Sequence, residues 1–220
     1  MIIDVDVVSD FVCPWCFIGK VRLSGAIAKY ESENPGSSVR VNWLPYFLNP
    51  DTPVLGEPYR PFLVKKFGGA RAVDELFERV RAAAGAEGPA FAFEQIRLRV
   101  NTLRAHRLVY RAQALGWRPE VVRAMVDALF VAYFQDARDI GDIGTLADIA
   151  AAAGGRRDDV LTYLEGEDDV AAVRKMANQL TRQGVSGVPC FVFNRRLAVS
   201  GAQSEAALGA ALIQSLGESG

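Results

Sequence analysis

The sequence contains a single histidine and only three cysteines among 220 residues. Three cysteines are too few for a secreted scaffold held by disulfides, and their odd number leaves one thiol unpaired. Charge of one sign is also lacking, because 25 Lys and Arg residues face 26 Asp and Glu residues and the net charge is −1. This balance gives no bulk attraction to nucleic acid or to an anionic membrane, so neither is an expected partner.

Long apolar runs are lacking as well, since no stretch is long enough to span a bilayer. Asp4 and Asp6 interrupt the apolar residues near the N-terminus, so we expect no secretory signal and place the chain in the cytoplasm. With 50% hydrophobic and 23% charged residues, the rest of the composition is that of an ordinary folded protein. The length fits one core with a sizeable insertion.

The hydrophobic pattern divides the chain into a β-α-β start, a helical middle and a β-β-α end. Apolar alternation predicts strands at 3–8, 39–47, 190–193 and 197–199. Helical spacing predicts helices at 14–31, 72–84, 103–115, 121–134, 145–153, 159–164, 170–180 and 203–216. Prolines crowd residues 45–61 and predict an irregular crossing. We therefore expect an α/β fold in which residues 1–49 and 184–220 form one sheet domain and residues 50–183 form an inserted helical domain.

The motif Cys13-Pro14-Trp15-Cys16 follows the first predicted strand and opens a helix. Two thiols at this spacing lie close enough to form a reversible disulfide, and a helix N-terminus stabilises a thiolate. Cys13 is therefore the predicted nucleophile, and Cys16 is predicted to resolve the mixed disulfide. A zinc site would need two further ligands, for which the sequence offers only Cys190 and His106, so we expect no metal.

A second motif, Val188-Pro189, lies at the head of the strand predicted at 190–193. A proline there cannot donate to a strand ladder, so its position requires a reason. A cis bond before Pro189 would let Val188 offer its main-chain groups to an extended substrate. The alternative is an ordinary trans proline that ends a loop.

Four segments of the sequence carry a family resemblance, namely residues 9–20, 101–102 with 105–108, 184–189, and 199–203. Through them the chain resembles the DsbA-like disulfide oxidoreductases of the thioredoxin superfamily, and among these the FrnE-like branch. The resemblance implies a thioredoxin fold with a helical insertion, in which Pro189 is a cis-proline facing the cysteine pair. Related glutathione-dependent isomerases and kappa-class transferases carry a serine where Cys13 stands. Retention of both Cys13 and Cys16 therefore favours thiol–disulfide exchange.

Further candidates are Trp15 and Gln203 for substrate binding and Asn101, His106 and Cys190 as auxiliary residues. Trp15 would present an aromatic surface to the substrate, while Gln203 precedes a helix whose free amides would hold a peptide or glutathione carboxylate, unless the segment is simply an N-cap. The resemblance places Asn101 and His106 on the active-site side, although a lone histidine is more often structural. Lys20 is expected to be solvated.

Cys190 directly follows Pro189, and successive side chains of a strand point to opposite faces. We therefore expect Cys190 to be an inert core thiol, the alternative being a thiol that exchanges with Cys13 and Cys16.

Together, these features predict an enzyme that reduces, forms or isomerises disulfides in protein or small-thiol substrates. Its redox group would be the Cys13–Cys16 pair, without a metal or organic cofactor and with glutathione as a candidate co-substrate. Two alternatives remain open. One is a glutathione-dependent isomerase or transferase of the 2-hydroxychromene-2-carboxylate isomerase or kappa type, and the other is a non-enzymatic holdase.

Overall fold

The computed structural model describes residues 1–217 and contains a four-stranded sheet in the order β2-β1-β5-β6. Its strands span Ile2–Ser9 (β1), Ser38–Pro45 (β2), Cys190–Phe193 (β5) and Leu197–Ser200 (β6). β1 runs parallel to β2 and antiparallel to β5, with Val8 opposite Cys190, and β6 runs antiparallel to β5. In β1, Ile3, Val5 and Val7 are buried while the acids between them are half-buried, as the alternation predicts.

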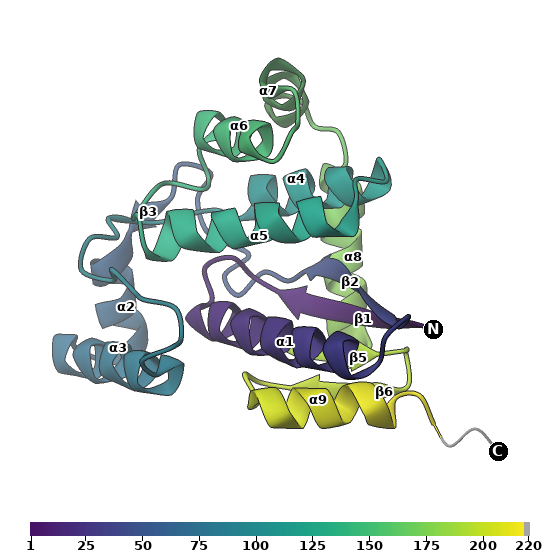
Figure 1. Ribbon diagram of the computed structural model, residues 1–220. Coiled ribbons are helices and arrows are strands. Elements are labelled where there is room, and N and C mark those ends of the chain that lie inside the picture. Colours follow the sequence, from purple (N-terminus) through teal and green to yellow (C-terminus); the bar gives the residue numbers. More distant parts are fainter. Residues whose placement is uncertain (218–220) are drawn as a thin grey trace.

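The helices of the described chain cover both faces of this sheet and extend beyond it. They span Pro14–Glu33 (α1), Tyr59–Phe67 (α2), Ala70–Ala84 (α3), Leu103–Ala114 (α4), Pro119–Phe134 (α5), Ile143–Ala152 (α6), Arg157–Glu165 (α7), Val170–Arg182 (α8) and Glu205–Gln214 (α9). α1 and α9 pack together on one face, and α8 crosses the other face, where it contacts β2 (Figure 1). This β-α-β start and β-β-α end with helices on both faces form a thioredoxin-like α/β fold, which confirms the predicted fold class.

The segment between β2 and β5 is mainly helical, as predicted. Its α2–α3 hairpin lies beside the N-terminal end of α1, and α4 to α7 lie on the side of the sheet away from α9 (Figure 1). The boundaries at 49–50 and 183–184 stay a prediction. α8 lies within the predicted insertion but packs on β2, and buried residues of both predicted parts form one continuous core.

Two elements of the described chain were not predicted, the helix α2 and a short ladder of β3 (Glu57–Pro58) with β4 (Leu98–Arg99). The prolines around α2 indicated an irregular crossing, but Pro61 is the third residue of this helix. A proline is tolerated in the first turn because the N–H group that it lacks would have no helical partner there. The ladder is too short to leave an alternating pattern in the sequence.

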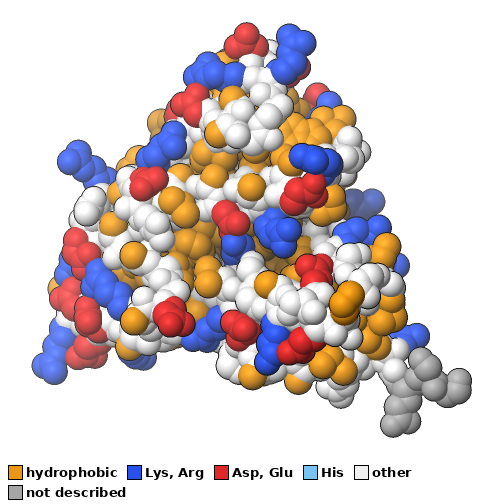
Figure 2. All heavy atoms as spheres, in the orientation of Figure 1, with side chains coloured by type: hydrophobic (Ala, Val, Ile, Leu, Met, Phe, Trp, Pro, Cys, Tyr) orange, Lys and Arg blue, Asp and Glu red, His pale blue; other side chains and the backbone are white. Residues whose placement is uncertain are grey.

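None of the helices within residues 1–217 is both long enough and apolar enough to cross a membrane. Acidic and basic side chains are interspersed over the face seen in Figure 2, without a region of one sign that dominates it. This mixture agrees with the net charge of −1.

Candidate active site

Cys13 is the N-cap residue of α1, in the turn that follows β1. Its amide donates to the Asp10 carbonyl at 3.0 Å, and its carbonyl accepts from the amides of Cys16 and Phe17 at 3.0 and 3.3 Å. Pro14 occupies the first helical position, where its fixed φ suits the helix. The turn thus places Cys13 at the N-terminal end of a 20-residue helix, where the helix dipole is positive.

Cys16 lies one turn inside the same helix and is only 2% exposed. Burial raises the pKa of the Cys16 thiol well above its usual value, and the neighbouring Cys13 raises it further. The Asp10 backbone and the Ser9 hydroxyl lower it by less. All three cysteines are free thiols in the structure. Cys16 therefore remains protonated at neutral pH, as suits a thiol that acts second.

Val188, which precedes Pro189 in the loop before β5, faces Cys13. The Cys13 thiol donates to the Val188 carbonyl over 3.8 Å, and the Val188–Pro189 peptide bond is cis. The Pro189 carbonyl accepts from the Gly201 amide at 2.8 Å, which connects this loop to the end of β6. The structure thus brings the two motifs of the sequence into contact.

Gly19 allows Pro189 to approach α1 closely. A Cβ atom at this position would lie 3.0 Å from both Phe191 Cζ and Pro189 Cγ, closer than side chains normally approach. The absence of a side chain at Gly19 therefore fixes the spacing between the helix with the cysteines and the strand that follows Pro189.

Trp15 and Gln203 occupy different surroundings. Trp15 is half-buried and lines a cavity of about 240 Å³ together with Cys13 and Val188. Gln203 is exposed, and its side-chain amide donates to the Ser200 carbonyl at 2.9 Å. Ser204, the next residue, is the N-cap of α9 and accepts from the Ala207 amide. Substrate contact by either Trp15 or Gln203 stays a prediction.

A buried acid that the sequence analysis did not single out connects His106 to the cysteine turn. Asp10 is 1% exposed, accepts from the Leu48 amide at 2.9 Å and lies 3.4 Å from His106 Nε2. The histidine nitrogen is also 3.1 Å from the Tyr46 carbonyl. His106 therefore contacts the cysteine turn through Asp10. An aspartate before a Cys-x-x-Cys motif is the signal that would have indicated this residue.

The other two auxiliary candidates, Asn101 and Cys190, have different surroundings. Asn101 accepts from the Leu103 amide at the start of α4 and donates to the Thr52 carbonyl, so it organises the loop before that helix. Cys190 is buried between its strand neighbours Val8 and Ser200. Burial raises its thiol pKa, against a smaller opposite effect of Ser200. A role for either residue in exchange stays a prediction.

The expectation of a solvated Lys20 is wrong. Lys20 is 8% exposed, and its ammonium group pairs with Asp127 of α5. Burial and the charge of Arg123 lower the pKa of Lys20 to about 8 despite this ion pair. The sequence could not show this contact because α5 lies about a hundred residues further along the chain.

The fold and the cysteine turn together define a thioredoxin-like protein with a Cys-x-x-Cys motif at the start of α1. A family model described as the DSBA-like thioredoxin domain matches residues 4–212. The chain therefore belongs to the DsbA-like thioredoxin family, as its sequence motifs predict.

Three solved structures illustrate the relationship. The probable DsbA oxidoreductase SCO1869 from Streptomyces coelicolor is 29% identical, with a TM-score of 0.84 over 99% of this chain and 92% of its own. A 2-hydroxychromene-2-carboxylate isomerase is 17% identical, with a TM-score of 0.67 over 97% and 95% of the two chains. The cytosolic disulfide reductase DsbM from Pseudomonas aeruginosa is 18% identical, with a TM-score of 0.63 over 97% and 98%. The last two show similarity of fold alone.

Proposed function

We propose that this protein is a thiol–disulfide oxidoreductase that uses Cys13 and Cys16 as its redox pair. The observation that carries the proposal is the position of the Cys13 thiol, at the N-terminus of α1 and 3.8 Å from the Val188 carbonyl. An extended substrate bound along Val188 and Pro189 would have its disulfide next to this thiol. Membership of the DsbA-like family supports the same chemistry.

The reaction has two exchange steps. The Cys13 thiolate attacks one sulfur of the substrate disulfide, which forms a mixed disulfide and releases the other sulfur as a thiolate. Cys16 then loses its proton and attacks the Cys13 sulfur, which releases the second substrate thiol and leaves a Cys13–Cys16 disulfide. Two electrons pass from the cysteine pair to the substrate, and the reverse sequence would oxidise a dithiol substrate.

This function requires no metal or organic cofactor, because the cysteine pair is the redox group, and glutathione is a candidate co-substrate. We place the protein in the cytoplasm, where the glutathione potential of roughly −220 to −320 mV favours reduction or isomerisation over net oxidation. The substrates would be disulfides or thiols of proteins or small molecules. DsbM, a cytosolic disulfide reductase of similar fold, supports this assignment.

Three cysteine variants test the proposal through reduction of insulin disulfides. Cys13→Ser is expected to abolish the activity, and Cys16→Ala is expected to stop after the first step and accumulate the mixed disulfide, detected by mass spectrometry. Cys190→Ala removes an equally buried thiol and is expected to retain turnover. Unchanged insulin reduction by Cys13→Ser would contradict the proposal.

The same variants separate the two alternatives. Retained suppression of aggregation by Cys13→Ser, without redox activity in the wild type, would favour a holdase. Glutathione-dependent isomerisation of a chromene carboxylate would favour the isomerase, whose fold is similar to that of this chain. A cavity beside Cys13 is compatible with that second activity, but the paired thiols favour exchange.

A further inference from the structure

A cavity of about 240 Å³ opens beside the redox pair and extends away from it toward the helical segment. One wall consists of the cysteine turn with Cys13, Pro14 and Trp15, together with Val188. Residues of α2 and α3 supply much of the remaining lining, and in Figure 1 these two helices lie beside the start of α1. A cavity of roughly 150 Å³ accepts a benzene ring, so this space holds one substituted aromatic ring.

The wall formed by the helical segment is mainly aromatic. Its rings are those of Tyr59, Phe62, Phe67, Phe77, Phe93 and Tyr133. Phe77 and Phe93 stack with their centroids 4.3 Å apart, which gives the cavity a rigid aromatic side. Aromatic walls favour flat ligands that offer a ring face or edge, and they disfavour a polar peptide chain.

Two basic residues line the same cavity, and its described lining contains neither aspartate nor glutamate. Arg99 is 5% exposed, and its guanidinium lies over the Phe62 ring at 3.7 Å from the centroid. One terminal nitrogen of Arg99 pairs with Glu57, whereas the buried Nε atom has no hydrogen-bond partner within the described chain. A buried donor without a partner is costly, and a small movement of the side chain that brought Nε to an acceptor atom of a ligand would remove that cost.

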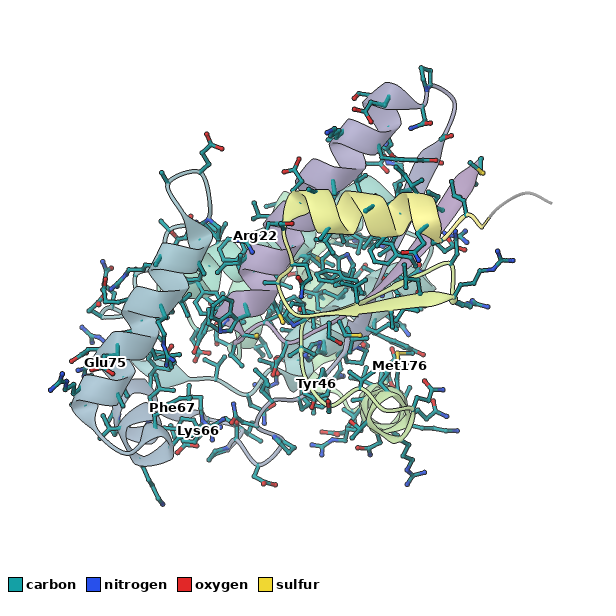
Figure 3. The ribbon with its side chains drawn as sticks, turned by 90° about the horizontal axis from the view of Figure 1, so that it is seen from below. Arg22, Tyr46, Lys66, Phe67, Glu75 and Met176 are labelled. Carbon is teal, nitrogen blue, oxygen red and sulfur yellow. The ribbon has the colours of Figure 1, made fainter. Side chains whose placement is uncertain are left out.

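Lys66 supplies the second cation at the more exposed side of the cavity. Its ammonium group is 3.0 Å from the Asn49 side-chain oxygen and 5.5 Å from the Phe62 ring centroid. Figure 3 shows Lys66 next to Phe67 in the α2–α3 part of the molecule. Since Glu57 offsets the charge of Arg99, Lys66 leaves the cavity with a net positive charge.

We infer that this cavity binds small aromatic disulfides or thiols that carry a carboxylate, with the ring among the aromatic side chains and the carboxylate toward Arg99 and Lys66. The inference rests on the proposed function of Cys13, and it deepens that function by naming a substrate class. The cavity adjoins the Cys13 thiol, so a ligand held in it would present its sulfur to the nucleophile.

The reaction of such a substrate is balanced by the cysteine pair alone. Cys13 attacks one sulfur of the aromatic disulfide, a new S–S bond forms to Cys13, and the first aromatic thiolate leaves. Cys16 then gives up its proton to solvent and attacks the Cys13 sulfur, which releases the second aromatic thiolate. The two protein thiols are oxidised to a disulfide, and the substrate disulfide is reduced to two thiols.

Two reagents that differ in ring charge test the inference in single-turnover kinetics. Dithiobis(nitrobenzoate) carries a carboxylate on each ring, whereas dithiodipyridine is neutral at pH 7, and both release a coloured thiol. The rate with the acid is expected to saturate with its concentration, because binding precedes reaction. The preference is the rate with the acid divided by the rate with the neutral reagent. This ratio is expected to be about tenfold larger for the protein than for free N-acetylcysteine, which is the size expected for a charged hydrogen bond.

Paired variants assign this preference to the cavity. Lys66→Gln should lower the preference about threefold, while Lys65→Gln, the same change one residue earlier on α2, should not alter it. Arg99→Lys keeps the charge but removes Nε and should lower the preference about tenfold, with the exposed Arg97→Lys as its control. Leu76→Trp should fill the cavity and slow both reagents. If Arg99→Lys fails to fold, the comparison of Lys66→Gln with Lys65→Gln still tests the inference.

The inference would be overturned if the protein preferred the acid no more than free N-acetylcysteine does. It would also be overturned if Lys65→Gln and Lys66→Gln lowered this preference equally. Calorimetric titration of the Cys13→Ser protein with nitrobenzoate tests ligand binding by the cavity separately from the proposed redox function, because this acid contains no disulfide. Binding is expected there, and it should weaken in Lys66→Gln. Insulin reduction without nitrobenzoate binding would overturn the cavity assignment alone, whereas binding without insulin reduction would overturn the redox function.

Discussion

The thiols of Cys13 and Cys16 are equally hidden from solvent, yet their surroundings assign them different roles. Cys13 contacts the Val188 carbonyl and lines the cavity, whereas Cys16 lies beneath it against Ser9 and Asp10. Burial is the first cause of the raised pKa of the Cys16 thiol and the Cys13 thiol adds to it, so a mixed disulfide on Cys13 would remove the part of the increase that comes from Cys13. This asymmetry agrees with the proposed order of the two exchange steps.

The raised pKa of Cys16 also makes the stability of the reduced protein depend on pH. In the unfolded chain this thiol releases its proton near its usual value of 9.0, while the folded protein retains the proton to higher pH. Above about pH 9 the folded state therefore binds more protons, and the free energy of unfolding falls as pH rises, by at most about 1.4 kcal/mol per pH unit.

Comparison of the reduced wild type with Cys16→Ala isolates this effect. Lys20, whose pKa is lowered to about 8, contributes in the opposite direction in both proteins, so the difference between them carries the test. Urea unfolding between about pH 8 and pH 10 should give the wild type a slope of unfolding free energy against pH that is more negative than that of the variant. Parallel slopes would mean that Cys16 titrates alike in the folded and unfolded chain.

Some residues of the site were visible in the sequence because they form local motifs. Cys13 and Cys16 are neighbours in one turn, and Pro189 is marked by its position before a strand. Asp10 and Lys20 were not visible in this way. Their partners, His106 and Asp127, lie about a hundred residues away, so only the fold brings them together.

At the scale of elements, a single arginine of α4 holds the end of α7. Arg107 is 2% exposed and donates to the carbonyls of Tyr163, Leu164, Gly166 and Asp168 at 2.8–3.3 Å. The last carbonyls of a helix have no partner within the helix, and a positive charge there also interacts favourably with the helix dipole. Arg107 thus fixes α7 against α4.

Replacement of this residue should be costly. Arg107→Met is expected to lower the free energy of unfolding by about 3 kcal/mol, because four carbonyls lose a charged donor that is itself buried. Arg104→Met on the same helix removes one hydrogen bond, to Gly141, and should cost about 1 kcal/mol. Urea unfolding monitored by circular dichroism measures both, and equal losses would contradict the capping role.

Most helices and strands followed from local pattern, since amphipathic spacing and prolines mark their bounds. The prediction failed for α2, because a proline can either interrupt a helix or occupy its first turn. Pro61 lies inside the first turn of α2, a position that sequence alone does not separate from a loop. The sequence also could not show that α2 and α3 would lie beside the cysteine turn, because their position depends on packing across the whole chain.

At the scale of the whole molecule, Arg22 of α1 connects two distant segments. Its guanidinium donates to the Ala83 carbonyl near the end of α3 at 2.5 Å and to the Ala202 carbonyl before α9 at 2.6 Å. Figure 3 shows Arg22 on α1 close to the start of α9. This side chain therefore attaches the α2–α3 hairpin, which forms one wall of the cavity, to the sheet domain.

Loss of that attachment should loosen the hairpin without unfolding the sheet. In Arg22→Ala, amide hydrogen exchange is expected to accelerate about tenfold in α3 and to remain unchanged in β1 and β5. Lys29→Ala, an exposed cation on the same helix, is the control. Uniform acceleration across α3 and the sheet would indicate global destabilisation instead.

The central position of β1 has a consequence for biosynthesis. β1 and β2 pair after about forty residues, but the other neighbour of β1 is β5, and Cys13 meets Val188 across 175 positions of the chain. During most of its synthesis on the ribosome, the nascent chain therefore contains Cys13 and Cys16 but not yet Val188, whose carbonyl contacts Cys13 in the folded protein. Contacts of such high contact order form late, so assembly of the redox site coincides with completion of the sheet.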